Sequence, residues 1–181
     1  MRAGLAAIVA GEPVTITEVD VRERAVRARA PEHALPRPGT REARQLRRWL
    51  TQVLIAERVV AREAGPGCGA DAPTHAELLP DTLAHMEIGS VAAATLADPV
   101  GRAVFVRVTS GVDVSAAAVA DYQARNPGRL PETAVAGHLR ASARRRAYRR
   151  WLDARCAELV TLAPGYEHPG DPRQPDNTHS H

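Results

Sequence analysis

The sequence has no lysine, and aromatic residues make up only 3% of its 181 residues. The few large apolar rings include Trp49, Phe105 and Trp151. A hydrophobic core must therefore be built mainly from Ala, Val and Leu. A chain of this length can bury such a core without cross-links. Its alanine content favours helix, because Ala has the highest intrinsic helix propensity.

Cysteine and long apolar runs are also scarce. Two cysteines, Cys68 and Cys156, exclude a disulfide framework and are expected to be reduced thiols. No apolar run reaches the roughly 20 residues that a transmembrane helix needs. The apolar start is interrupted by Glu12 and Glu18, so we predict no export signal, no membrane partner and a cytoplasmic protein.

The net charge is small. The 24 basic residues, all arginine, stand against 21 acidic residues, which leaves +3. Such a balance does not require a nucleic acid or a membrane surface as partner. We therefore expect a protein client or partner enzymes, with a homodimer as a further alternative.

Two long helices are predicted from apolar residues that recur every three or four positions. The first starts near Ala43 and ends at Gly65-Pro66-Gly67. The second runs from about Glu132 to Val160, and its apolar stripe includes Val135, Leu139 and Trp151. Each stripe needs a partner to cover it, which predicts a bundle.

Shorter elements are predicted around these helices. At the amino-terminal end, a small β-element over residues 7–16 precedes a helix from Thr17 to about Ala30. Helices are also expected over residues 75–87 (after a Thr74 cap), 91–96, 99–109 and after Ser115. For 99–109, β-branched residues favour a strand and the Asp98-Pro99 start favours a helix; we predict a helix.

The predicted fold is mainly α: a single-domain helical bundle over residues 1–163 with a small amino-terminal β-element. Residues 164–181 contain four prolines, two glycines and three histidines without periodicity. We predict an irregular Pro/His-rich tail there.

Three phrases resemble the SurA/PrsA-type foldases. VAGEPVTITEVD is similar to the opening strand and turn of that family, LRRWLTQVLIAERVVAREA to its following helix, and VDVSAAAVADYQARNPGRL to a later helix. The resemblance covers residues 6–65 and 105–162. It implies a SurA amino-terminal-domain-like fold and a chaperone function.

The sequence departs from that family in one respect. There a parvulin-type prolyl isomerase domain follows the N-P-x-x-F phrase, whereas here Pro131 leads directly into the last helix. The resemblance therefore implies the client-binding module and does not extend to isomerase activity.

The phrases RQLRRWLTQVL and GYEHPGDPRQPDNTH also resemble a small actinobacterial family whose members are often labelled malonyl-CoA:acyl-carrier-protein transacylase. That label implies polyketide biosynthesis. The chemistry needs a serine on a G-x-S-x-G elbow, and no serine of this sequence lies in that motif. We therefore expect no such catalysis, and the sequence identifies no catalytic residue.

Two binding sites are hypothesised on the long helices. An apolar groove would hold a client segment, with Trp49, Val53, Trp151 and Leu152 as anchors or as plain core. Arg144, Arg145 and Arg149 would bind anions such as phosphate, or form a solvated face paired with nearby acids.

A third site is hypothesised in the tail. His168, Asp176, His179 and His181 are ligand types that zinc accepts, so a divalent metal is an alternative to a solvated segment. No cofactor is otherwise expected.

These observations favour a non-catalytic, chaperone-like or accessory binding protein that serves a polyketide biosynthetic pathway. The alternative is a small enzyme of that pathway, using the tail histidines or Cys68 for metal-dependent or acyl-transfer chemistry.

Overall fold

A computed structural model describes residues 4–65, 68–69 and 71–168. These residues form two compact units. We call residues 4–59 with 155–168 the terminal unit, and the described residues of 60–154 the central unit. The prediction of one domain over residues 1–163 stays a prediction.

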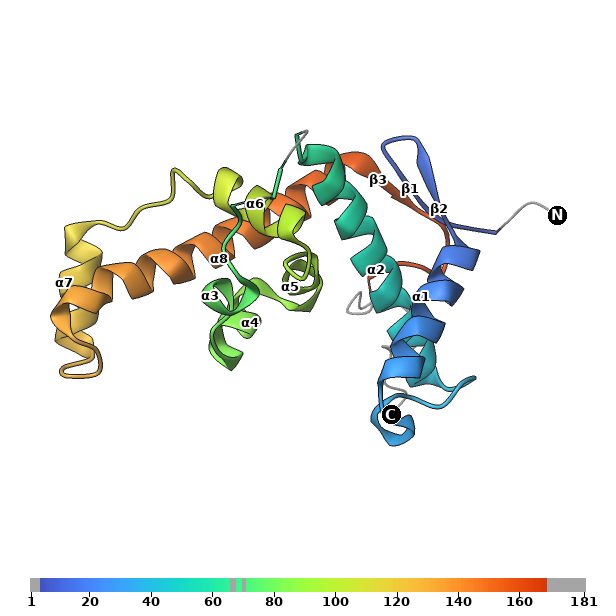
Figure 1. Ribbon diagram of the computed structural model, residues 1–181, viewed down its shortest axis with the longest axis horizontal. Helices are drawn as coiled ribbons and strands as arrows, with labels where there is room; N and C mark the ends of the chain where they lie inside the picture. Colours follow the sequence, from blue (N-terminus) through green and yellow to red (C-terminus); the bar gives the residue numbers. More distant parts are fainter. Residues whose placement is uncertain (1–3, 66–67, 70, 169–181) are drawn as a thin grey trace, which may run out of the picture. The chain divides into compact units, whose positions relative to one another are not determined.

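The described residues are mostly helical, with a small antiparallel sheet (Figure 1). This confirms the mainly α class with an amino-terminal β-element. None of their helices is long and apolar enough to cross a membrane. In chain order the elements are β1 (Leu5–Val9), β2 (Glu12–Thr15), α1 (Ile16–Arg29), a 3-10 turn (Glu32–Ala34), α2 (Arg41–Glu63), α3 (His75–Leu78), α4 (Thr82–Ile88), α5 (Ser90–Thr95), α6 (Pro99–Val108), α7 (Ala116–Arg125), α8 (Glu132–Leu159) and β3 (Val160–Leu162).

The sheet of the terminal unit has the strand order β2-β1-β3. The hairpin turns at Ala10 and Gly11, which both have positive φ, as the tight turns between right-twisted strands require. Strand β3 pairs with β1 through Ala7 and Leu162. The sequence did not predict this third strand, because the last helix was expected to continue to Val160.

Helix α1 begins two residues earlier than predicted. The side chain of Thr15, not Thr17, caps it by accepting a hydrogen bond from the Glu18 amide. The Glu18 carboxylate in turn accepts a hydrogen bond from the Thr15 amide at 2.7 Å. This reciprocal capping box satisfies two amides that would otherwise lack partners. The backbone hydrogen bond from Thr15 is the main reason why the pKa of Glu18 is lowered.

Arginines join α1 to the part of α2 in the terminal unit. Arg47 reaches both Asp20 and Glu23 at 2.7 Å, and Arg22 pairs with Glu57. Burial acts to raise the pKa of Glu23, but hydrogen bonds from Arg27 and Arg47 outweigh it, so the pKa is lowered. The pairing order places the two helices antiparallel.

In the central unit, several helix starts agree with the prediction. Asp98 caps α6 by accepting a hydrogen bond from Val100, and Ser115 caps α7 by accepting one from Ala118. Residues 99–108 are therefore helical, as predicted. The expected helix over 75–87 is wrong as one piece: it stops at Leu78, and α4 restarts after Pro80 with Asp81 as its cap. Proline lacks the amide that a continuous helix would need.

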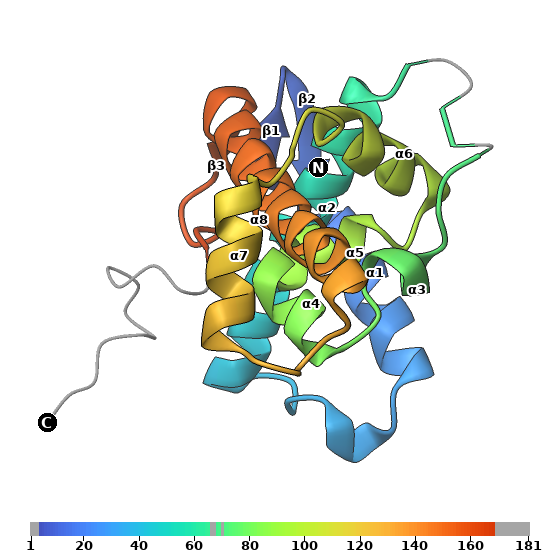
Figure 2. The ribbon, with the colours of Figure 1, turned by 90° about the vertical axis from the view of Figure 1, so that its left-hand side faces the viewer.

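The core of the central unit forms around Tyr148, which is fully buried. This residue belongs to α8, the long orange helix in Figure 2. Its hydroxyl lies 2.8 Å from Thr95 Oγ1, and its ring lies 5.1 Å from that of Phe105. Helix α6 approaches α5 closely at Gly101, where an added Cβ would lie 1.8 Å from the Thr95 carbonyl oxygen. Three of the six aromatic residues of the chain, Phe105, Tyr148 and Trp151, are thus gathered in this core.

Candidate functional site

The four hypothesised groove residues fall in two units. Trp49 and Val53 lie on α2 in the terminal unit, where Val53 is buried and Trp49 is half-buried. Trp151 and Leu152 lie on α8 in the central unit. Leu152 is buried, and the half-buried Trp151 ring stacks on Tyr148 at 5.5 Å. Within each unit, one residue is core and its neighbour remains half-accessible.

Two of the three hypothesised anion-binding arginines serve internal contacts. The Arg145 side chain is 8% exposed, and its Nε donates to Glu87 at 2.7 Å. Arg144 Nε donates to Thr109 Oγ1 at 2.8 Å, and its guanidinium carbon lies 5.4 Å from the centre of the Phe105 ring. These guanidiniums join α8 to α4 and α6.

Glu87 is the acceptor at the centre of a polar cluster. Besides Arg145, its carboxylate accepts a hydrogen bond from Ser142 and lies 3.4 Å from Arg146. Burial acts to raise the pKa of Glu87, but the hydrogen bonds from Ser142 and Arg145 and the charges of Arg145 and Arg146 lower it overall. The carboxylate is therefore charged at neutral pH and holds α4 against α8.

Other arginines of α8 are more accessible. Arg149 is 55% exposed and lies 3.9 Å from Asp153, and Arg146 is 51% exposed. Arg150 is exposed and has no ion pair with any described residue. Helical spacing puts Arg146, Arg149 and Arg150 on one side of α8. Of these three, only Arg149 is among the arginines hypothesised to bind anions.

Only part of the predicted tail lies within the described residues. Gly165 and Tyr166 accept hydrogen bonds through their carbonyl oxygens from Arg48 and Gln52 of α2, at 3.2 and 3.1 Å. His168 is exposed. Asp176, His179 and His181 lie outside the described residues. Up to His168, the described chain contains no group of three or more His, Cys, Asp or Glu side chains that could hold a metal ion.

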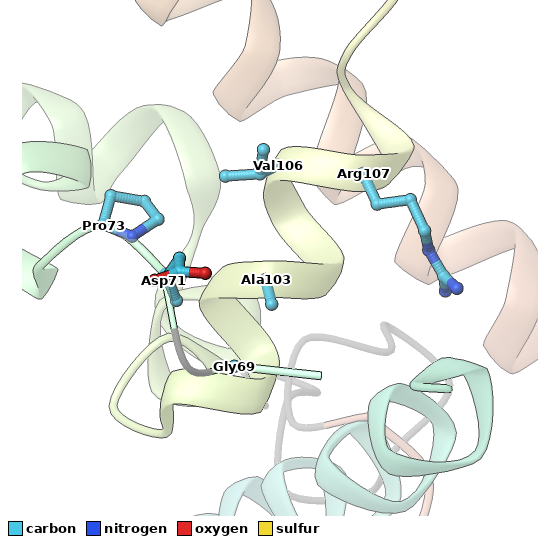
Figure 3. A pocket seen from close by; sticks show the side chains of 7 residues that line it. Gly69, Asp71, Pro73, Ala103, Val106 and Arg107 are labelled. Carbon is cyan, nitrogen blue, oxygen red and sulfur yellow. The ribbon is translucent and has the colours of Figure 1, made fainter. Parts of the chain in front are cut away.

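A pocket of about 310 Å³ lies in the central unit between residues 69 and 71–73 on one side and α6 on the other (Figure 3). Its lining is mostly apolar, with Pro73, Ala103 and Val106 contributing carbon surface. Arg107 points away from Asp71 in the close-up, and its guanidinium donates to the Glu63 carbonyl oxygen. The space suits a small apolar side chain.

Helix α7 and the first turns of α8 form an exposed helical pair, which we call the α7–α8 hairpin (residues 116–139). Helix α7 has no buried residue. Its Tyr122 ring meets His138 of α8 at 5.7 Å, and Val135 is the buried residue on the α8 side. The half-buried apolar side chains of the hairpin are Val119, Tyr122, Leu130 and Leu139. These side chains retain apolar surface that a partner could cover.

Comparison with known proteins gives a short match. The model of a family of unknown function (DUF7158) matches residues 5–42, from β1 to the first turn of α2. This segment covers less than half of the chain and lies in the terminal unit. No curated protein and no solved structure matches the chain.

Proposed function

We propose that this protein is a non-catalytic, chaperone-like binding protein of the SurA/PrsA type, and that the α7–α8 hairpin holds its client. The observation that carries the proposal is that α7 buries none of its residues. A helix that contributes so little to a core keeps its apolar side chains available for a partner.

The connection within the hairpin also supports the proposal. Helix α7 ends at Arg125 and α8 begins at Glu132, so the linker comprises residues 126–131. In the foldases that this chain resembles, the isomerase domain is inserted at this position. The short linker instead brings α7 back against α8, and this forms the hairpin.

The first test measures suppression of aggregation. Reduced insulin, which aggregates after its chains separate, is the probe, and light scattering is the readout. We expect the protein to lower the scattering and the double variant Val119→Ser/Tyr122→Ser to lose most of this effect. Val21→Ser is the matched control, because Val21 lies on α1 and is 53% exposed. Circular dichroism checks that each variant keeps its helices.

No suppression by the unmodified protein, or full suppression by the double variant, would contradict the proposal. For the pathway, we propose that the clients are polyketide biosynthetic enzymes. A pull-down from the native host in mild salt should then retain a small, fixed set of such enzymes. A broad mixture of unfolded proteins would instead indicate a general holdase.

A further inference from the structure

A second surface of the central unit combines exposed apolar and basic side chains. Leu83 and Met86, three residues apart on α4, are 51% and 70% exposed. We call these two residues with Arg146, Arg149 and Arg150 of α8 the α4–α8 surface. It shares no residue with the α7–α8 hairpin, so this inference and the proposed function can fail independently.

Contacts between the two helices bring two of the arginines to the end of α4 that follows Leu83 and Met86. Arg146 Nη1 lies 3.4 Å from the carboxylate of Glu87, the residue after Met86 and one turn after Leu83. At the end of α4, a Cβ added to Gly89 would lie 3.6 Å from the guanidinium carbon of Arg149. Arg146 and Arg149 therefore lie beside the carboxyl-terminal end of α4, within one to two turns of Leu83 and Met86.

This surface carries an excess of positive charge. Arg145, Arg146, Arg149 and Arg150 of α8 stand against the carboxylates of Glu87, Asp153 and Asp81, the exposed cap of α4, which leaves one positive charge. Arg145 is buried against Glu87, so that carboxylate is already neutralised by a closer partner. The uncompensated charge thus lies on the exposed arginines.

We propose that the α4–α8 surface binds an acidic amphipathic helix of a partner protein. Arg146 and Arg150 are one turn apart, a rise of about 6 Å along α8. Two carboxylates at positions i and i+4 of a partner helix have the same spacing. An adjacent apolar stripe on that helix would cover Leu83 and Met86, as in other recognition of amphipathic helices. Charge complementarity selects an acidic helix over a basic one.

The test uses the full chain and a fluorescent synthetic helix of about 18 residues, long enough to form several turns. The probe carries Glu at i, i+4 positions beside a Leu stripe, and the matched probe carries Gln in place of Glu. Fluorescence anisotropy measures binding. We expect the acidic probe to bind and the Gln probe to bind at least about tenfold more weakly. Added salt should weaken the binding of the acidic probe, because it screens the charges.

Variants then locate the site. Arg146→Glu/Arg150→Glu should weaken binding of the acidic probe at least about tenfold. Leu83→Ser/Met86→Ser should weaken the binding of both probes, because both carry the Leu stripe. The control Arg24→Glu/Arg29→Glu makes the same charge change on exposed arginines of α1, outside both proposed binding surfaces, and should leave the affinity nearly unchanged. Arg146→Gln/Arg150→Gln, which avoids placing new carboxylates near Glu87, should show a smaller loss in the same direction.

Several results would overturn the inference: no binding of the acidic probe, equal binding of the Gln probe, or equal losses in the control variant. Tighter binding of a single-stranded oligonucleotide that displaces the probe would also overturn it, because the surface would then select phosphates rather than an amphipathic helix. Each variant is also made in a Trp49→Phe background, where emission from Trp151, which stacks on Tyr148, confirms that the central unit is folded.

Discussion

The ion pair between Arg145 and Glu87 in the central unit is buried more deeply than the pairs between α1 and α2 in the terminal unit. In the terminal unit, the arginines that join α1 to α2 are partly open to water: Arg22 and Glu57 are each 35% exposed, and Arg47 is 29% exposed. In the central unit, Arg145 is 8% exposed beside Glu87. Exposed ion pairs contribute little to the stability of the fold, because water and salt screen their charges. A buried charge, in contrast, destabilises strongly when its partner is removed.

This difference also follows the distribution of large side chains. The central unit packs Tyr148, Phe105 and Trp151 together, and Glu87 pairs there with the buried Arg145. A dense core that excludes water strengthens each polar contact within it. A chain poor in aromatics can thus make one unit whose stability is sensitive to single polar residues.

The largest expected effect comes from Glu87→Ala. It leaves the buried Arg145 without its carboxylate, so the central unit should lose about 3–5 kcal/mol of unfolding free energy. Urea unfolding in a Trp49→Phe background measures this, because the remaining Trp151 stacks on Tyr148 of that unit. The double variant Glu87→Gln/Arg145→Met, which removes both charges, should recover part of the loss. If Glu87→Ala lowers the free energy of unfolding by less than about 1 kcal/mol, the Arg145–Glu87 pair contributes no more than an exposed ion pair, and the expectation is wrong.

A smaller effect is expected from Gly101→Ala. The new methyl group would overlap the Thr95 carbonyl oxygen, so α6 would have to move away from α5. This should lower the free energy of unfolding by about 1–3 kcal/mol. Gly137→Ala on α8 is the matched control, because a Cβ there meets nothing within 4 Å. It should stabilise the helix by about 0.5–1 kcal/mol. Opposite signs for the two substitutions in thermal unfolding would confirm that close approach, not glycine as such, matters at position 101.

The smallest effect is expected from Glu57→Gln in the terminal unit. Removing its half-exposed ion pair with Arg22 should lower the free energy of unfolding by less than about 1 kcal/mol. Trp49 reports this unit in a Trp151→Phe background. In about 1 M salt, where the Debye length falls to ~3 Å, the difference from the unmodified protein should nearly vanish. A cost as large as that of Glu87→Ala would remove the contrast between the units.

Local signals predicted several elements well. The Asp98-Pro99 start, the Ser115 cap and the Thr74 cap each act within one helical turn, and all three are present in the structure. The errors have equally local causes. The Thr15–Glu18 capping box was present in the sequence but Thr17 was chosen, and the break at Pro80 was not recognised.

The hypothesised sites were less predictable, and α8 shows why. Its predicted apolar stripe included Val135, which is buried, but the buried line also contains Ser142 and Arg145. Periodicity assigns an arginine to the solvent side because burying its charge is costly. That assignment changes only when another part of the chain supplies a carboxylate, here Glu87 from α4.

By itself, the sequence determined the helical class, most helix starts and the amino-terminal β-element, because propensity, capping and turn chemistry act between residues close in the chain. Tertiary structure alone decided that β3 joins the sheet, that Arg145 is buried with Glu87, and that Arg146 and Arg149 lie beside the end of α4. These outcomes depend on pairings between residues tens of positions apart. No local preference specifies such pairings, because their free energy arises only once the distant segments pack together.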